Sequence, residues 1–160
     1  MKRAIVTPDK HFPFEDKPAI KVLCKAIELV KPDIYIDLGD TGEWESVSHW
    51  QWKKKKRPPL EYQLPFVHKE IKAVNKGLDT IDKAKTKERH FIEGNHDDWL
   101  NRFVEENPYL SDTMTVPKAL KLKERGYKYH KIGKYLKIGK INFYHGHHFS
   151  GLTHTRNHLL

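Results

Sequence analysis

The chain has 160 residues, the usual length of one domain, with 30 Lys and Arg residues against 21 Asp and Glu residues and a formal net charge of +9. This balance favours partners that carry phosphate but says little about the fold. The single cysteine, Cys24, excludes an internal disulfide framework. The apolar run near the N-terminus is far shorter than a signal peptide or a membrane span requires. We therefore expect one soluble, cytoplasmic domain over residues 1–160 with no membrane partner.

The first part of the chain contains two predicted strands separated by a helix. Ala4–Thr7 is a short β-branched run, which is typical of a buried strand. Asp16 can cap a following helix. The apolar side chains of this helix share one face: Ile20, Leu23, Cys24 and Ile27. Residues 33–38 form the second predicted strand, which leads into Asp40.

The middle of the chain predicts a long helix, a strand and a shorter helix. The long helix has Pro65 near its first turn, and its polar face is mostly lysine. Its predicted core face consists of Phe66, Val67, Ile71, Val74, Leu78 and Ile81. A third short strand is predicted over residues 89–92, and a helix over residues 97–106.

The last part of the chain is richer in strand patterns. Residues 127–131 and 134–138 are predicted strands, and a Gly-Lys pair forms a turn into a further strand over residues 141–144, which delivers His145. Residues 152–160 have the pattern of a helix start without any stop signal. We therefore expect the chain to be truncated.

Polar side chains stand just beyond the predicted strand ends: Asp9, His11, Asp40, Asn95, His96 and His145. The alternation of strands and helices predicts a largely parallel sheet, and open α/β sheets gather ligands outside the carboxyl ends of their strands. Carboxylate, imidazole and amide oxygen suit Mn, Zn, Fe or Ni, whereas the lack of thiolates argues against a structural zinc site. Because a carboxylate has several lone-pair directions, Asp40 can bridge two ions.

Four ordered blocks of the sequence resemble the signature of the calcineurin-like metallophosphoesterases. They are Asp9-Lys10-His11, Gly39-Asp40-Thr41-Gly42-Glu43, Gly94-Asn95-His96-Asp97 and His145-Gly146-His147. The first block, with the Phe-Pro-Phe that follows it, is similar to the phage and bacterial members, and the resemblance extends to the last residue. It implies an α/β (α+β) fold, a metallophosphoesterase-like β-sandwich flanked by helices, in a bacterial or phage-infected cell.

The resemblance implies two divalent metal ions as cofactors, with Mn the first expectation and Zn, Fe or Ni as alternatives. Their ligand sets would share Asp40: Asp9 and His11 complete one, and Asn95 and His145 complete the other. A hydroxide that bridges the two ions would attack phosphorus in line. The implied reaction is the hydrolysis of a phosphate ester.

The same resemblance assigns roles to the neighbours of these ligands. His96 would protonate the leaving group or stabilise phosphoryl oxygens, and Asp97 would orient its ring and raise its pKa. Glu43 takes the position of an acid that supports a metal ligand. The equal alternative is that it is an ordinary acidic residue at the start of a helix. His147 is a candidate for contact with substrate or metal, and an ordinary surface histidine is its alternative.

The sequence departs from the family at one point. The family carries a final Gly-His-x-His block that gives one histidine to each metal, and no such block follows His145. Each ion would then have three protein ligands in place of four, so its affinity should be lower. The second sheet would be incomplete, and its apolar edge could pair with another chain in an oligomer.

Residues 53–59 form a basic loop that follows Trp44, Trp50 and Trp52. Its five cationic residues are Lys53, Lys54, Lys55, Lys56 and Arg57. Basic charge beside aromatic rings can hold single-stranded nucleic acid, through phosphate contacts and base stacking. The alternative is a solvated loop without a partner.

Three functions follow from these observations. The leading hypothesis is a dinuclear-metal phosphoesterase, acting as a phosphodiesterase or nuclease on a phosphate-ester substrate. The second is a non-catalytic nucleic-acid-binding module on the same fold, and the third is a phosphoprotein phosphatase. Each aspartate taken alone is more often a turn or helix-cap residue than a ligand, so the hypothesis depends on the ordered set of blocks.

Overall fold

The computed structural model describes residues 2–53 and 55–146. Its elements in chain order are β1 (Ala4–Thr7), α1 (Lys17–Val30), β2 (Ile34–Asp37), the short 3₁₀ helix η1 (Glu45–Val47), α2 (His49–Trp52), α3 (Leu60–Asp82), β3 (Glu88–Ile92), α4 (Asn95–Glu106), the 3₁₀ helix η2 (Pro108–Leu110), α5 (Val116–Ala119), β4 (Tyr127–His130), β5 (Leu136–Ile138) and β6 (Ile141–Phe143). Lys54, His147 and the helix expected over 152–160 lie outside the described residues.

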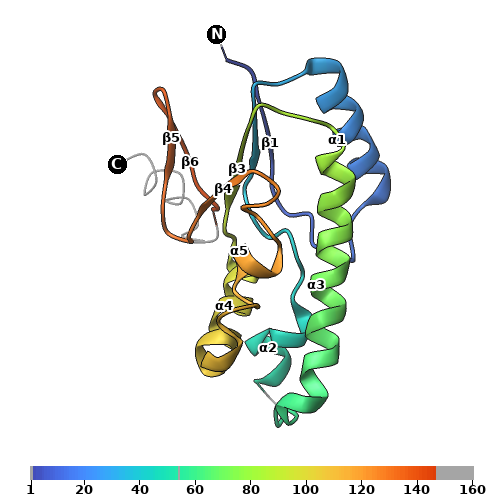
Figure 1. Cartoon of the computed structure of the whole chain (residues 1–160), viewed down its shortest axis with the longest axis vertical. Coiled ribbons are helices and arrows are strands. Elements are labelled where there is room, and N and C mark those ends of the chain that lie inside the picture. The colour runs from blue at the N-terminus through green and yellow to red at the C-terminus, as the bar shows by residue number, and fades with distance from the viewer. Residues whose placement is uncertain (1, 54, 147–160) are drawn as a thin grey trace, which may run out of the picture.

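The strands β1 to β4 form one parallel sheet in the order β1-β2-β3-β4, as the alternating pattern predicted. Each strand of this sheet lies directly beside the strand that precedes it in the chain, and always on the same side of it. Because parallel crossovers are right-handed, such steps put the connecting helices on one face. Figure 1 shows α1 and α3 on one side of the sheet and the β5–β6 hairpin on the other. All four parallel strands therefore end at the same rim.

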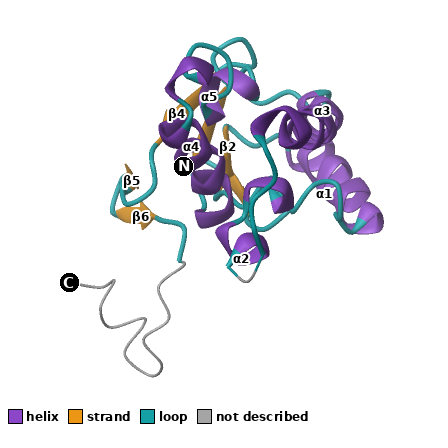
Figure 2. Ribbon diagram, turned by 90° about the horizontal axis from the view of Figure 1, so that it is seen from below, coloured by secondary structure: helices purple, strands orange, loops and turns teal. Residues whose placement is uncertain are grey.

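Both faces of the parallel sheet are covered, which explains the continuous apolar character of β2. Tyr35 packs with the helices in the larger core, whereas Ile34 and Ile36 pack in a smaller cluster with Leu136 of β5. Figure 2 shows the same arrangement, with the hairpin apart from α1 and α3 and the parallel strands between them. The molecule is thus a mixed α/β structure with three layers.

The helices α1 and α3 differ in how well the sequence pattern predicted them. Asp16 caps α1 as predicted, since its side chain accepts from the backbone N–H of Ala19 at 3.1 Å. The helix α3 starts at Leu60, so Pro65 lies inside it and not near its start. Phe66 was predicted in the core but is 63% exposed, because its neighbour Val67 takes the buried face and one residue turns the helix by about 100°.

The hairpin β5–β6 is antiparallel, and Leu136 pairs with Phe143. The second sheet was expected to be incomplete, and its two described strands pack on the parallel sheet through a few apolar side chains. In the part of the chain that the structure describes, none of the helices has the length and apolarity needed to cross a bilayer.

Candidate metal centre

One cavity of about 430 Å³ opens at the rim where the parallel strands end. Its lining includes every side chain expected there from the sequence: Asp9, His11, Asp40, Asn95, His96 and His145. Leu38 and Tyr144 complete one wall of this metal-site cavity. Residues more than 100 positions apart in the chain are brought together, because the loops after β1, β2 and β3 leave the sheet at the same rim and His145 follows β6 of the hairpin that packs on this sheet.

The loops after β1 and β2 carry the first group of candidate ligands. Asp9, His11 and Asp40 each offer an atom within 4.8 Å of the others. All three have left-handed backbone conformations, with φ of 52°, 47° and 48°. Such conformations are uncommon outside glycine and persist only where the surroundings hold them. Here the backbone N–H groups of Asp9 and His11 donate to the carbonyls of Gly39 and Asp40, both at 3.0 Å.

Glu43 fixes the ring of His11. Nδ1 of His11 lies 2.7 Å from Oε2 of Glu43, and a carboxylate can only accept at this distance when ionised. Nδ1 therefore carries the proton and Nε2 keeps its lone pair, which is the arrangement common to metal-binding histidines. His11, Glu43 and His96 also offer atoms within 4.8 Å of one another, in a separate set that does not include Asp40.

His145 shows the same arrangement on the other side of Asp40. Its Nδ1–H donates to the carbonyl of Leu38 at 2.7 Å. Its Nε2 lies 2.9 Å from Oδ1 of Asn95 and 3.4 Å from Oδ2 of Asp40. In the neutral ring all three atoms are acceptors, so a proton or a cation is needed between them. These three residues fit a divalent ion, since imidazole, amide oxygen and carboxylate form a suitable donor set.

The charge state of the shared carboxylate follows from its surroundings. Burial by itself would raise the pKa of Asp40, but the hydrogen bond and charge of His145 and the N–H of His96 outweigh it and lower the pKa. Burial acts in the opposite sense on His145, whose pKa is raised because Asp40 and the carbonyl of Leu38 stabilise the charged ring. Asp40 is therefore held as an anion beside an imidazole.

His96 stands at the entrance of α4, between the two ligand groups. Its backbone N–H donates to Oδ1 of Asp40 at 2.8 Å, and its Nδ1–H donates to the carbonyl of Glu43 at 3.0 Å. The ring stacks on Trp99 with 4.0 Å between centroids and meets the ring of His11 edge-on. The imidazole is thus held in one orientation against the cavity.

The role expected for Asp97 needs correction. Its carboxylate is fully buried and accepts hydrogen bonds from the indole N–H of Trp44 at 2.8 Å and the backbone N–H of Gly94 at 3.2 Å. The ring of His96 is oriented by the Glu43 carbonyl instead. Burial raises the pKa of Asp97 to about 7, although the Trp44 hydrogen bond lowers it. Because it is the third residue of α4, its side chain points back into the helix start and joins two loops.

Sequence reasoning missed a buried ion pair beneath the site. Nζ of Lys10 lies 2.7 Å from Oδ1 of Asp37, and both side chains are almost entirely buried. The same oxygen accepts from the N–H of Gly39 and the hydroxyl of Thr41, on either side of Asp40. Asp37 thus connects the loop that carries Asp9 and His11 to the loop that carries Asp40. An aspartate inside the apolar strand pattern was the signal in the sequence.

The basic loop lies apart from these ligand groups. Lys53 sits over the ring of Trp50, 4.8 Å from its centroid, and Arg57 pairs with Glu106 of α4. Lys55 and Lys56 are exposed. Lys54 and His147, which were also expected to contact a partner, fall in the stretches without described coordinates. Three described lysines of the loop are therefore accessible to an anionic partner.

The cavity can hold cations between side chains that are already oriented for them. His11 and His145 each donate their Nδ1–H to a fixed acceptor, and the buried carboxylate of Asp40 lines the same cavity. No protein-family model matches this chain, and neither does any curated protein.

Proposed function

We propose that the chain is a two-metal phosphoesterase of the calcineurin-like kind, acting as a phosphodiesterase or nuclease. One observation carries the proposal: two groups of acceptor atoms converge on the single buried carboxylate of Asp40. A shared carboxylate can bridge two neighbouring cations, because its two oxygens offer several lone pairs. The order of the four sequence blocks supports the same family.

In this proposal Asp9, His11 and Asp40 hold one ion, and Asp40, Asn95 and His145 hold the other. Ions bound there supply an acidified water and polarise the phosphoryl oxygens of an ester. The ligand atoms are nitrogen and oxygen without sulfur, which suits Mn, Zn, Fe and Ni alike, and the family resemblance makes Mn the first expectation.

The remaining residues act by orientation and by moving a proton. Glu43 accepts from Nδ1–H of His11, and the carbonyl of Leu38 accepts from Nδ1–H of His145. The Nε2 lone pair of each ring therefore points away from these acceptors. The carbonyl of Glu43 keeps a proton on Nδ1 of His96, so its Nε2 can receive or give the other proton. At Nε2 the charged ring can donate to the leaving oxygen of an ester placed in the cavity.

Metal binding tests the first step of this proposal. Isothermal titration with Mn²⁺ should show binding to the unaltered protein, and more than about tenfold weaker binding to Asp40→Asn. Asp112→Asn is the matched control, because this carboxylate is 95% exposed and, among the described residues, pairs with Lys118 alone. Equal Mn²⁺ binding by the Asp40 and Asp112 variants would contradict the shared-carboxylate arrangement.

Turnover tests the second step. The Mn²⁺-loaded protein should hydrolyse a chromogenic phosphodiester, and His96→Asn should lower kcat by about 10²–10⁴-fold with Mn²⁺ binding retained. The loss of rate with retained metal distinguishes proton transfer from ligand loss. The proposal fails if no turnover occurs, or if Asp40→Asn turns over as fast as the unaltered protein.

A nucleic-acid-binding module without catalysis is the second candidate. The accessible lysines and the cation over Trp50 favour it. Tight binding of a single strand without hydrolysis of any ester would support it over an enzyme. For an active protein, relative rates on an oligonucleotide and on a phosphopeptide separate a nuclease from a phosphoprotein phosphatase.

A further inference from the structure

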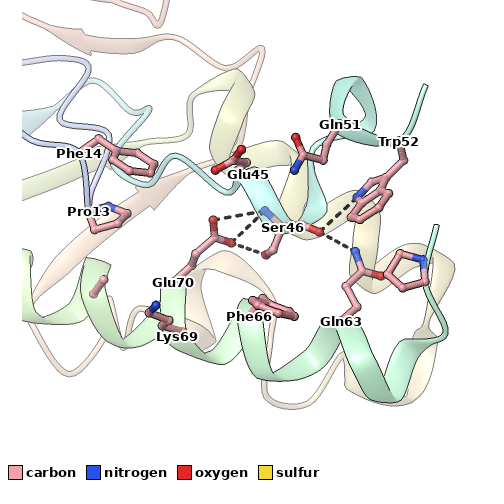
Figure 3. Close-up of a pocket in the computed structure, with 12 residues that line it drawn as sticks. Pro13, Phe14, Glu45, Ser46, Gln51, Trp52, Gln63, Phe66, Lys69 and Glu70 are labelled. Carbon is pink, nitrogen blue, oxygen red and sulfur yellow. Dashed lines mark hydrogen bonds between the residues drawn. The ribbon is translucent and has the colours of Figure 1, made fainter. Parts of the chain in front are cut away.

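A second hollow, of about 420 Å³, lies between α3 and the segment that contains η1 and α2. We name it the aromatic pocket, and its rings and hydrocarbon walls come from Pro13, Phe14, Trp52, Pro58, Phe66 and Ala73. Figure 3 shows Phe66 rising from α3 into the hollow, with Pro13 and Phe14 at one end and Trp52 at the other. Phe14 and Phe66 are 66% and 63% exposed, so two phenyl rings face solvent here.

The wall opposite α3 is fixed by hydrogen bonds. The carbonyl of Ser46 accepts from the side-chain amide of Gln63 at 2.6 Å and from the indole of Trp52 at 3.4 Å. The carboxylate of Glu70 accepts from the backbone N–H and the hydroxyl of Ser46. Figure 3 shows Ser46 of η1 linked to Glu70 and Gln63 of α3 and to Trp52 of α2. These hydrogen bonds fix the distance between the two walls of the pocket. The phenyl rings of Phe14 and Phe66 stay exposed and can contact a ligand.

The aromatic pocket adjoins the metal-site cavity along two chain segments. Pro13 and Phe14 follow His11 after one residue, Phe12, and Glu45 and Ser46 follow Glu43 after one residue, Trp44. The segments run side by side, because the N–H of Glu43 donates to the carbonyl of Phe12 and a bridge joins Phe12 to Gly42. A ligand that spans both hollows would place one part at the candidate metal ligands and another on the phenyl rings.

The charged side chains that line the pocket are one lysine, Lys69, and two carboxylates, Glu45 and Glu70. The basic loop follows Trp52 and contains Pro58, and both of these residues also line the pocket. Lys53, Lys55 and Lys56 are exposed along that loop, and Lys69 lines the pocket from α3. A planar ring carried on a chain of phosphates matches both features, because bases stack on aromatic side chains while phosphates attract lysines.

We propose that the aromatic pocket binds a base of single-stranded nucleic acid, next to the phosphodiester held at the metal-site cavity. Phe66 and Phe14 provide the stacking faces, and the exposed lysines hold the backbone. That the bound base belongs to a substrate rests on the proposed function. Base binding itself depends only on the pocket and can be measured without metal.

The test is the binding of a fluorescein-labelled oligothymidylate, followed by fluorescence anisotropy in EDTA. Phe66→Ala should weaken binding about tenfold, which is about 1.4 kcal/mol, since it removes one stacking face. Phe66→Tyr should bind like the unaltered protein because it keeps a stacking ring. Tyr62→Ala is the matched control: this residue is a 65% exposed aromatic on the same helix, outside the pocket lining.

An abasic strand of the same length separates stacking from charge. Its binding should be weaker than that of oligothymidylate and equal for the unaltered protein and Phe66→Ala. Equal oligothymidylate affinity of Phe66→Ala and Tyr62→Ala would overturn the proposal, as would equal affinity of the unaltered protein for both strands. A dimer that Phe66→Ala converts to a monomer, with strand affinity unchanged, would show an interface between copies and would also overturn it.

Turnover of a small chromogenic diester, which has no base, distinguishes this proposal from the proposed function. Turnover without base-dependent binding overturns the pocket proposal and leaves the enzyme in place. Base-dependent binding without turnover supports the pocket and removes its role as part of an active site.

Discussion

The metal-site cavity and the aromatic pocket are neighbours built in opposite ways. In the first, the side chains come from strand ends and are held by short hydrogen bonds, as with the buried Asp40 and the ring of His145. In the second, the rings of Phe14 and Phe66 stand on the surface. Charged ligands need donors that are fixed in advance, whereas a planar ring can be bound by surfaces that adjust. Substitutions should therefore affect stability strongly near the first and weakly near the second.

The largest effect is expected from the buried ion pair under the metal-site cavity. Asp37→Ala leaves the ammonium of Lys10 buried without its partner, so the free energy of unfolding should fall by about 3–5 kcal/mol in urea denaturation at neutral pH. The double variant Lys10→Met with Asp37→Leu should recover part of this loss, because no charge remains buried. A loss below about 1 kcal/mol for Asp37→Ala would contradict the account of how the two loops are joined.

The next effect concerns the close approach of Gly94 to Asp40. A Cβ at Gly94 would lie 2.1 Å from Oδ1 and 2.2 Å from the backbone nitrogen of Asp40. Gly94→Ala should therefore separate the two loops, lowering the free energy of unfolding by about 1–3 kcal/mol and weakening Mn²⁺ binding. Gly139→Asn is the control, because that turn has open space around it and asparagine tolerates its positive φ of 61°. Mn²⁺ titration and urea denaturation of both variants measure the difference.

A smaller effect should appear on the far face of the sheet, where His90 and His130 contact each other at 2.9 Å. Burial lowers the pKa of both rings below the ordinary value of 6.5, although Glu88 opposes this at His90. The folded state therefore favours the neutral rings. Their contribution to the free energy of unfolding is complete above about pH 6.5 and is lost as the pH falls below that value. Stability measured from pH 7 to pH 5 should fall less in His90→Asn than in the unaltered protein. An equal slope would show that the pair does not titrate on unfolding.

The smallest effect is expected at the rim of the aromatic pocket. Because the ring of Phe66 is mostly exposed, Phe66→Ala should change the free energy of unfolding by no more than about 0.5 kcal/mol. Tyr62→Ala should behave in the same way. Thermal and urea denaturation measure both variants, and a loss well above this value at Phe66 alone would mean that the ring packs as part of the core.

Much of the fold could be predicted because local patterns agreed with the global arrangement. Ala4–Thr7 was predicted to the residue, and the Asp16 cap and the parallel sheet were also confirmed. Pro65 was expected near the first turn of α3, but the helix starts at Leu60 and Pro65 lies inside it, since a proline inside a helix is tolerated when the remaining turns are well packed. The exposure of Phe66 could not be read from spacing, because Val67 beside it fits the same pattern.

The candidate ligands were found by their position after strands, but their relations to one another were not. The sequence indicated that Asp97 would serve His96, and only the packed structure shows that it turns inward to Trp44 and Gly94. The Lys10–Asp37 pair also joins residues from different strands, so no local pattern could reveal it.

By itself, the sequence determined which elements form and which polar residues follow each strand, because helix and strand periodicities and turn residues act over a few positions. Only the tertiary structure decided which of these residues meet, which nitrogen of each histidine carries its proton, and where an aromatic pocket opens beside the metal-site cavity. Those features depend on contacts between segments distant in the chain, such as His145 with Leu38 and Glu43 with His11, and they exist only after the layers have packed.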